Sequence, residues 1–118
     1  MFLRNLWYFA TPGHRLKAGS LQSKILLGEP VMLGRTLDGD PFALRNICPH
    51  RGVPLTYGRL DGNEVECCYH GWRFDTRGRC TKIPSLAERQ TFELAQISVR
   101  RYACREVQGN VWVYMDDE

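Results

Sequence analysis

Two short clusters of metal-ligating side chains constrain this chain more than any other feature of its sequence. The first cluster contains Cys48 and His50, the second contains Cys67, Cys68 and His70, and 16 residues separate them. The chain has only three histidines, so two of the three fall inside the clusters. Thiolate and imidazole groups are donors that proteins use to bind transition metals. The chain must therefore fold so that two separate loops meet around one metal centre.

The composition is that of one globular domain. With 118 residues, 43% hydrophobic and 25% charged, the chain can bury a core of its own. We expect a single domain over residues 1–118. The net charge of +3 is small and the basic residues are scattered, which argues against a nucleic-acid partner, because phosphates require a clustered basic surface. No apolar stretch approaches the roughly 20 residues of a membrane helix, so we expect no membrane partner.

The cysteines indicate a reducing compartment. Five cysteines form no regular disulfide framework, and residues 1–5 lack the apolar run of a signal peptide. We therefore expect a cytoplasmic protein. Cys80 and Cys104 are expected to be small apolar residues within strands. His14, next to Gly13, is expected to be a surface histidine.

Four hairpin signals predict antiparallel β-structure. In each, two short runs rich in β-branched or aromatic residues flank a turn that contains glycine. The paired runs are residues 31–36 with 42–45, 58–60 with 65–67, 72–75 with 79–83, and 97–107 with 111–115. Short strands at this spacing predict an all-β fold, a small antiparallel sandwich or barrel. Only residues 85–94 resemble a helix.

Both ligand clusters lie at the ends of predicted strands. Residues 48–50 follow the strand predicted at 42–45, and residues 67–70 follow the second hairpin. Two such loops at one end of a sheet can enclose a metal centre. The ligand set fits a tetrahedral Cys2His2 zinc site. It equally fits a two-iron, two-sulfide cluster with two cysteines on one iron and two histidines on the other, and the ligand spacing leaves both open.

The residues around the ligands narrow this choice. Residues 48–55 read Cys-Pro-His-Arg-Gly-Val-Pro-Leu, and residues 67–75 read Cys-Cys-Tyr-His-Gly-Trp-Arg-Phe-Asp. Together they closely resemble the Rieske signature of the ring-hydroxylating and O-demethylating non-haem iron oxygenases. Residues 5–8, 80–85 and 109–113 resemble further segments of that family's N-terminal domain. The resemblance covers nearly the whole chain and implies a Rieske-type fold with a two-loop cluster-binding subdomain.

The resemblance implies a Rieske [2Fe-2S] cluster and assigns its ligands. Carried over residue by residue, Cys48 and Cys67 bind the inner iron, while His50 and His70 bind the outer iron nearer the surface. The family usually has proline where this chain has Cys68. The Cys-x-x-His spacing therefore selects Cys67 as the ligand, and Cys68 is expected to be a free thiol beside the cluster.

The potential of the cluster is expected to lie low in the Rieske range. High-potential respiratory members carry a disulfide between the loops, at the positions of Val53 and Tyr69 here. They also carry hydroxyl donors at the positions of Trp72 and Phe74. Fewer hydrogen bonds stabilise the reduced cluster less, so we expect a potential of roughly −150 mV.

The resemblance also implies a role in electron transfer. In the family, electrons pass from a reductase or ferredoxin through the Rieske centre to a mononuclear iron, in a catalytic domain or a neighbouring subunit, which activates dioxygen against an aromatic or related substrate. That second iron needs two histidines and a carboxylate. With His50 and His70 committed to the cluster, only His14 remains, so this chain cannot build that site.

Three functions are consistent with these residues. The first is the Rieske domain of an aromatic-compound oxygenase terminal component whose catalytic iron domain is absent from this chain. The second is a free-standing Rieske ferredoxin, an electron carrier without its own substrate. The third is a zinc-stabilised structural module.

Overall fold

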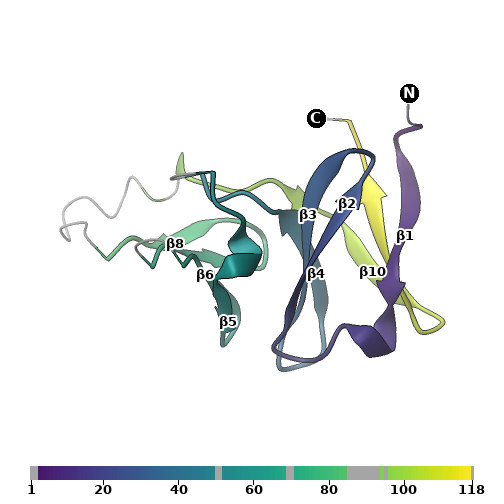
Figure 1. The fold of residues 1–118 in the computed structure, drawn as a ribbon, viewed down its shortest axis with the longest axis horizontal. Coiled ribbons are helices and arrows are strands. Elements are labelled where there is room, and N and C mark those ends of the chain that lie inside the picture. Colours follow the sequence, from purple (N-terminus) through teal and green to yellow (C-terminus); the bar gives the residue numbers. More distant parts are fainter. Residues whose placement is uncertain (1–2, 50–51, 69–70, 85–93, 95, 118) are drawn as a thin grey trace.

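The chain folds into three antiparallel sheets (Figure 1). The structure is a computed structural model and describes residues 3–49, 52–68, 71–84, 94 and 96–117. The expected all-β fold is confirmed. Within these described ranges, no helix is long and apolar enough to cross a membrane. The helix expected at residues 85–94 lies, except for its last residue, outside the described part of the chain.

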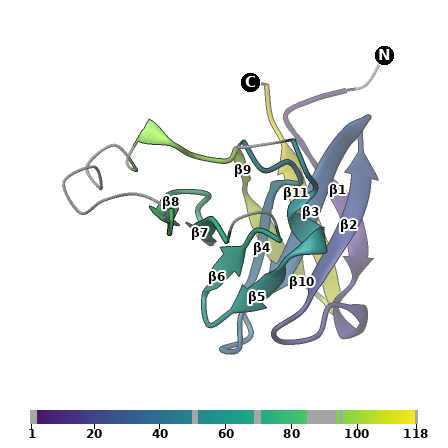
Figure 2. The ribbon, with the colours of Figure 1, turned by 60° about the vertical axis from the view of Figure 1, so that its left-hand side comes forward.

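The three sheets occupy separate places in the molecule (Figures 1 and 2). The terminal sheet consists of β1 (Leu6–Pro12), β11 (Asn110–Met115) and β10 (Cys104–Val107), in that order. The central sheet consists of β2 (Leu21–Leu26), β3 (Glu29–Arg35), β4 (Pro41–Arg45) and β9 (Arg101–Tyr102). The loop-bearing sheet consists of β5 (Arg59–Asp61), β6 (Glu64–Glu66), β7 (Arg73–Asp75) and β8 (Cys80–Lys82). The structure also describes two 3-10 turns with defined bounds, η1 (Gly13–Arg15) and η2 (Leu55–Tyr57).

Three of the predicted hairpins form as expected. They are β3 with β4, β5 with β6, and β7 with β8. Gly39 and Gly62 occupy the first two turns with φ of 97° and 63°, a backbone conformation that glycine adopts without strain.

The strand predicted over residues 97–107 is wrong as a single element. It divides after Tyr102: β9 pairs with β4 of the central sheet, whereas β10 pairs with β11 of the terminal sheet. Residues 97–99 meanwhile bond to the loop-bearing sheet, since the Cys80 amide donates to the Ile97 carbonyl and the Val99 amide donates to the Gly78 carbonyl. This one segment therefore connects all three sheets.

The central sheet separates two hydrophobic cores. Val31 and Leu33 of β3 pack in the core shared with the terminal sheet, whereas Met32, between them, packs in the core shared with the loop-bearing sheet. On β4, Ala43 faces the first core and Leu44 the second. Successive side chains of a strand point to opposite faces, so β3 and β4 are covered on both sides. The terminal and loop-bearing sheets thus lie on opposite sides of the central sheet.

Candidate metal centre

The first ligand loop follows β4 and closes on itself through backbone hydrogen bonds. The Cys48 amide donates to the Val53 carbonyl at 2.7 Å, and the Gly52 amide donates to the Cys48 carbonyl at 2.8 Å. Gly52 has φ of 72°, which permits the reversal of the chain. Both backbone groups of Cys48 are therefore hydrogen-bonded within the loop, which holds its backbone in place.

A buried asparagine joins the two ends of the first loop. The Asn46 side chain donates through Nδ2 to Thr56 Oγ1 and accepts at Oδ1 from the Thr56 amide, both at 3.0 Å. Only 7% of Asn46 is exposed, and its own amide donates to the Pro30 carbonyl of β3. The sequence does not predict this pair, because no local pattern connects residues ten positions apart.

The second ligand loop closes in the same way. The Cys67 amide donates to the Trp72 carbonyl at 2.7 Å, and Gly71 lies within the loop with φ of 69°. The chain that follows the first loop also runs, at Gly58, against the end of β6 and the start of the second loop. A Cβ atom at Gly58 would lie 1.9 Å from the Glu66 carbonyl oxygen and 3.1 Å from the Cys68 nitrogen. Only glycine allows the two loops to approach this closely.

The structure brings the two predicted cysteine ligands into one core. Cys48 and Cys67 are buried in the core shared with the loop-bearing sheet, together with Leu55 and Phe74. Trp72 is partly buried against the same core. A pair of buried thiolates is costly in apolar surroundings unless a cation compensates the charge, and iron would do so. The donor chemistry therefore fits the inner iron of a Rieske cluster.

The two histidines, His50 and His70, lie outside the described residues. Their predicted roles stay predictions. Among the described residues, which include neither histidine, no three His, Cys, Asp or Glu side chains form a metal-binding group.

The other thiols differ in exposure. Cys68 is exposed, while Cys80 is buried at the start of β8. Burial raises the pKa of the Cys80 thiol and raises that of Cys104, at the start of β10, to about 12. Cys80 and Cys104 thus remain neutral near pH 7, in keeping with their expected apolar role. His14 is exposed within η1, as expected.

An ion-pair cluster ties together the strands that lead into and out of the second loop. Arg73 of β7 donates to Glu64 and Glu66 of β6 at 2.8 and 2.9 Å, and to the carboxylate of Asp61 of β5 at 3.0 Å. Hydrogen bonds to Glu64 and Asp61 raise the pKa of Arg73 above its usual value. These contacts span three strands next to the second loop.

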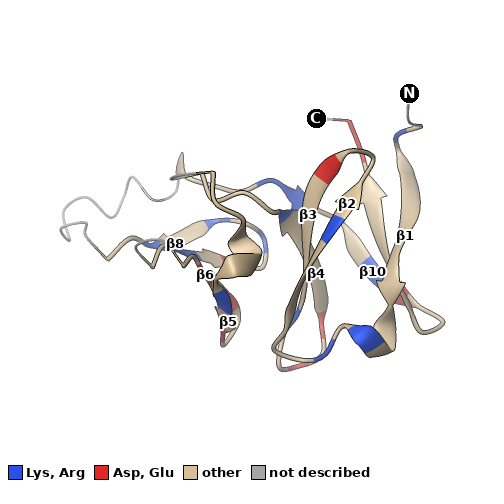
Figure 3. Ribbon diagram, in the orientation of Figure 1, with Lys and Arg blue, Asp and Glu red and all other residues tan. Residues whose placement is uncertain are grey.

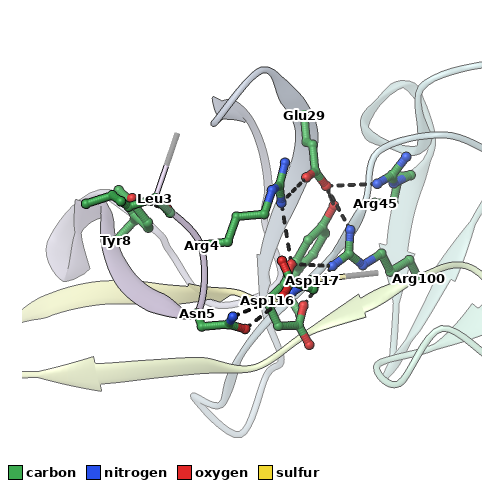
Figure 4. Close-up of polar contacts among 10 residues, drawn as sticks. Leu3, Arg4, Asn5, Tyr8, Glu29, Arg45, Arg100, Asp116 and Asp117 are labelled. Carbon is green, nitrogen blue, oxygen red and sulfur yellow. Dashed lines mark hydrogen bonds and ion pairs between the residues drawn. The ribbon is translucent and has the colours of Figure 1, made fainter. Parts of the chain in front are cut away.

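A second network lies at the base of the first loop (Figure 4). One oxygen of Glu29 accepts from Tyr102 at 2.7 Å, from Arg45 at 2.8 Å and from Arg100 at 3.0 Å, while the other lies 2.6 Å from Arg4. Burial alone would raise the pKa of Glu29, but the hydrogen bonds from Tyr102 and Arg4 and the charge of Arg100 outweigh it and hold the pKa below 4.5. Arg45 is the last residue of β4, so the network anchors the start of the loop.

The remaining charges are spread over the molecule. Figure 3 shows Lys and Arg residues on strands of all three sheets, interspersed with Asp and Glu. Charged residues of both signs are therefore scattered along the described part of the chain.

The fold and the paired loops correspond to a known class of redox domain. Residues 6–102 match the family described as the Rieske [2Fe-2S] domain, and the chain belongs to this family. The family implies a Rieske-type [2Fe-2S] cluster as the cofactor, in agreement with the sequence, and the zinc alternative is set aside.

Similar proteins are oxygenases by name. The chain is 38% identical, over 99% of its length, to the toluene-4-sulfonate monooxygenase system iron-sulfur subunit of Comamonas testosteroni. It is 39% identical, over 98% of its length, to chlorophyllide a oxygenase of Chlamydomonas reinhardtii. The crystal structure of apo dicamba monooxygenase superposes with a TM-score of 0.89 at 34% identity and covers 98% of this chain.

All three relatives are much longer than this chain. The 118 residues span 33% of the Comamonas subunit, 17% of the Chlamydomonas oxygenase and 35% of the dicamba monooxygenase chain. What is similar is therefore one domain of each relative.

Proposed function

We propose that this chain is the electron-transfer domain of a Rieske non-haem iron oxygenase that acts on an aromatic or related compound. The observation that carries the proposal is the burial of Cys48 and Cys67 in one core, at the bases of two closed loops, in a chain whose relatives are named as oxygenases. The catalytic iron would lie in polypeptide outside these 118 residues, because the chain has too few histidines to hold both centres.

Four side chains would hold the cofactor. Cys48 and Cys67 bind one iron, and His50 and His70 bind the other. The bound cluster supplies reversible one-electron chemistry, at a potential that its ligands and surroundings set. The closed backbone of each loop holds its thiolate in place. The apolar side chains of Leu55 and Phe74 exclude water from the side of the cluster that faces the hydrophobic core.

The partners follow from this role. The electron donor would be a reductase or a ferredoxin, and the acceptor an oxygenase catalytic domain in the same polypeptide or in a neighbouring subunit. One relative is named as the iron-sulfur subunit of a monooxygenase system, which favours a multi-component pathway for aromatic compounds. We further propose that residues 1–118 act as one domain and that the protein works in the cytoplasm.

Spectroscopy of the purified protein tests the cofactor and its ligands. We expect stoichiometric iron and sulfide, and a reduced-state EPR spectrum with the low average g value of a histidine-ligated cluster. Cys48→Ser and Cys67→Ser should lose the EPR signal, whereas Cys68→Ser, the matched control, should keep it. A colourless zinc protein would contradict the proposal, and loss of the cluster in Cys68→Ser alone would reassign the ligand.

The complete reading frame separates the oxygenase from its alternative. We expect it to continue beyond this domain and to encode two further histidines and a carboxylate that bind the catalytic iron. A reading frame without such residues, together with a normal Rieske EPR spectrum, would instead identify a free-standing Rieske ferredoxin.

A further inference from the structure

The outer side of the terminal sheet carries an aromatic face that is apolar and only partly covered. Strand register places Trp7 opposite Tyr114 and Phe9 opposite Trp112. Each pair is in edge-to-face contact, with ring centroids 5.3 and 5.9 Å apart. Arg105 and Val107 of β10 extend the face on the other side of β11. We call these six residues the aromatic face.

The face is more exposed than large apolar side chains usually are. Trp7 is 39% exposed, Phe9 48% and Val107 49%. A hollow of about 270 Å³ opens between Trp7, Trp112 and Val107, and the Arg105 guanidinium lies 5.4 Å from the centre of the Trp7 ring. Trp, Tyr, Phe and Arg are the side chains enriched at protein interfaces. A contiguous patch of them marks a surface that another protein surface covers.

Strand β11 has the composition of a strand that is buried on both sides. Val111, Val113 and Met115 are buried in the core beneath the terminal sheet. Trp112 and Tyr114, which alternate with them, lie on the aromatic face. An antiparallel strand with one face in water normally alternates apolar and polar residues, while a continuous apolar run is typical of a strand covered on both faces. The sequence of β11 therefore indicates that another protein surface covers its outer side.

The position of the face argues against an electron donor as that cover. The terminal sheet lies on the opposite side of the central sheet from the loop-bearing sheet (Figure 1). A protein docked on the aromatic face would be separated from Cys48 and Cys67 by the whole central sheet. A polypeptide that covers the aromatic face therefore supports this domain structurally and does not reach its metal centre.

The relatives are longer than this chain, and the polypeptide that they have in addition is a candidate for the surface that covers the aromatic face. This chain corresponds to about one third of the dicamba monooxygenase chain and of the Comamonas subunit. Strand β11 is the middle strand of the terminal sheet and the last strand of the chain. Polypeptide that continues past β11 would leave the domain at the end of this middle strand, next to Tyr114 of the aromatic face.

From these observations we propose that the aromatic face is the docking surface for the catalytic domain of the same polypeptide. This inference rests on the proposed function, since it requires that the chain be part of an oxygenase. The catalytic domain would place an apolar side chain in the hollow beside Trp112 and an acidic side chain near Arg105. The interface would then fix the domain from the side away from the cluster and leave the two ligand loops accessible to other partners.

Cysteine labelling in the full-length protein tests the docking surface. Val107→Cys introduces a thiol at the rim of the hollow, and Ile25→Cys, on β2 of the central sheet, is the matched control. Both native residues are exposed β-branched residues of strands, at 49% and 70%. We expect a maleimide to label position 107 at least ten-fold more slowly than position 25 in the folded protein, and equally fast in urea. Peptide-resolved mass spectrometry separates these sites from the native cysteines.

Four outcomes would overturn the inference. Equal labelling of the two positions in the folded protein would show an open face. Protection of position 107 that disappears on dilution would identify a second copy as the cover, and protection that requires an added reductase or ferredoxin would identify a redox partner. A reading frame that ends at residue 118 would leave no catalytic domain to dock. Labelling does not depend on the cluster, so a normal EPR spectrum with an open face refutes the docking alone, whereas a protected face without a cluster refutes the proposed function.

Discussion

At the scale of single residues, the side chain at position 74 sets the polarity on the inner side of the metal centre. Phe74 is fully buried in the same core as Cys48 and Cys67, and its ring offers no hydrogen-bond donor. Because hydrogen bonds to the sulfurs stabilise the reduced cluster, a residue without a donor at this position favours a low potential. We therefore expect a potential near the low end of the Rieske range, roughly −150 mV.

Phe74→Tyr tests this explanation. A new hydroxyl donor worth about 1 kcal/mol to the reduced state would raise the potential of a one-electron couple by roughly 40 mV. Protein-film voltammetry measures the change. Phe42→Tyr, in the same core but on β4 of the central sheet, is the matched control and should leave the potential unchanged. A wild-type potential well above zero would contradict the low-potential prediction itself.

At the scale of elements, the two ligand loops depend on their close approach at Gly58. Gly58 follows η2 and precedes β5, and it lies against the backbone of Glu66, the last residue of β6, and of Cys68 in the second loop. The contact is backbone to backbone, so a side chain at position 58 cannot turn aside. One residue without a Cβ atom thus sets the spacing between the two halves of the metal centre.

We expect Gly58→Ala to separate the loops and to reduce cluster incorporation by more than half. It should also lower the free energy of unfolding by about 2–4 kcal/mol, within the range of overpacked sites. Gly62→Ala is the matched control: Gly62 has φ of 63° but no atom within 4 Å of the added Cβ. It should cost only about 1 kcal/mol and retain the cluster. Iron content and urea unfolding measure both effects, and a fully loaded Gly58→Ala protein would show that the approach is dispensable.

The pairing of the strands shows what local sequence patterns can and cannot predict. The turn glycines and β-branched runs predict the hairpins β3–β4, β5–β6 and β7–β8, because both partners of a hairpin are adjacent in sequence. The division of residues 97–107 depends on which distant strand each part meets. β9 and β10 each contain only one aromatic or β-branched residue, Tyr102 and Val107, and their partners β4 and β11 are selected by the stacking of the sheets. No pattern within the segment encodes that choice.

At the scale of the whole molecule, Glu29 connects segments that are far apart in the chain. Its carboxylate joins Arg4 near the N-terminus, Arg45 at the end of β4 and Arg100 just before β9. Arg100 also binds Asp116, beyond β11. Figure 4 shows these side chains converging on the Glu29 carboxylate and the C-terminal acidic residues. One acidic residue therefore holds the terminal and central sheets together at the base of the first ligand loop.

We expect Glu29→Gln to lower the free energy of unfolding at pH 7 by about 2 kcal/mol, because three guanidinium groups lose a largely buried anion. The folded-state pKa of Glu29 is below 4.5, so the contribution of the carboxylate is complete above about pH 4.5 and is lost as the pH falls through the folded-state pKa. The difference between wild type and Glu29→Gln should therefore shrink as the pH is lowered below 4.5. Urea unfolding across this pH range measures it.

Glu106→Gln serves as the matched control for this prediction. Among the described residues Glu106 forms an ion pair with Arg35 only, and its side chain is 32% exposed, so its replacement should cost no more than about 1 kcal/mol. A Glu29→Gln variant as stable as wild type at pH 7 would show that the network contributes no net stability.

The family of this protein and much of its local structure can be predicted from the sequence alone. Ligand types, their spacing and the residues around them are local properties, so the two loops, the Rieske class and most hairpins are readable from it. Only the tertiary structure decided what depends on contacts between distant residues: the pairing of β1 with β11, the link between Asn46 and Thr56, the Glu29 network and the aromatic face. These features arise when sheets stack and side chains far apart in the chain come to share one environment, and that information is not present in any single segment.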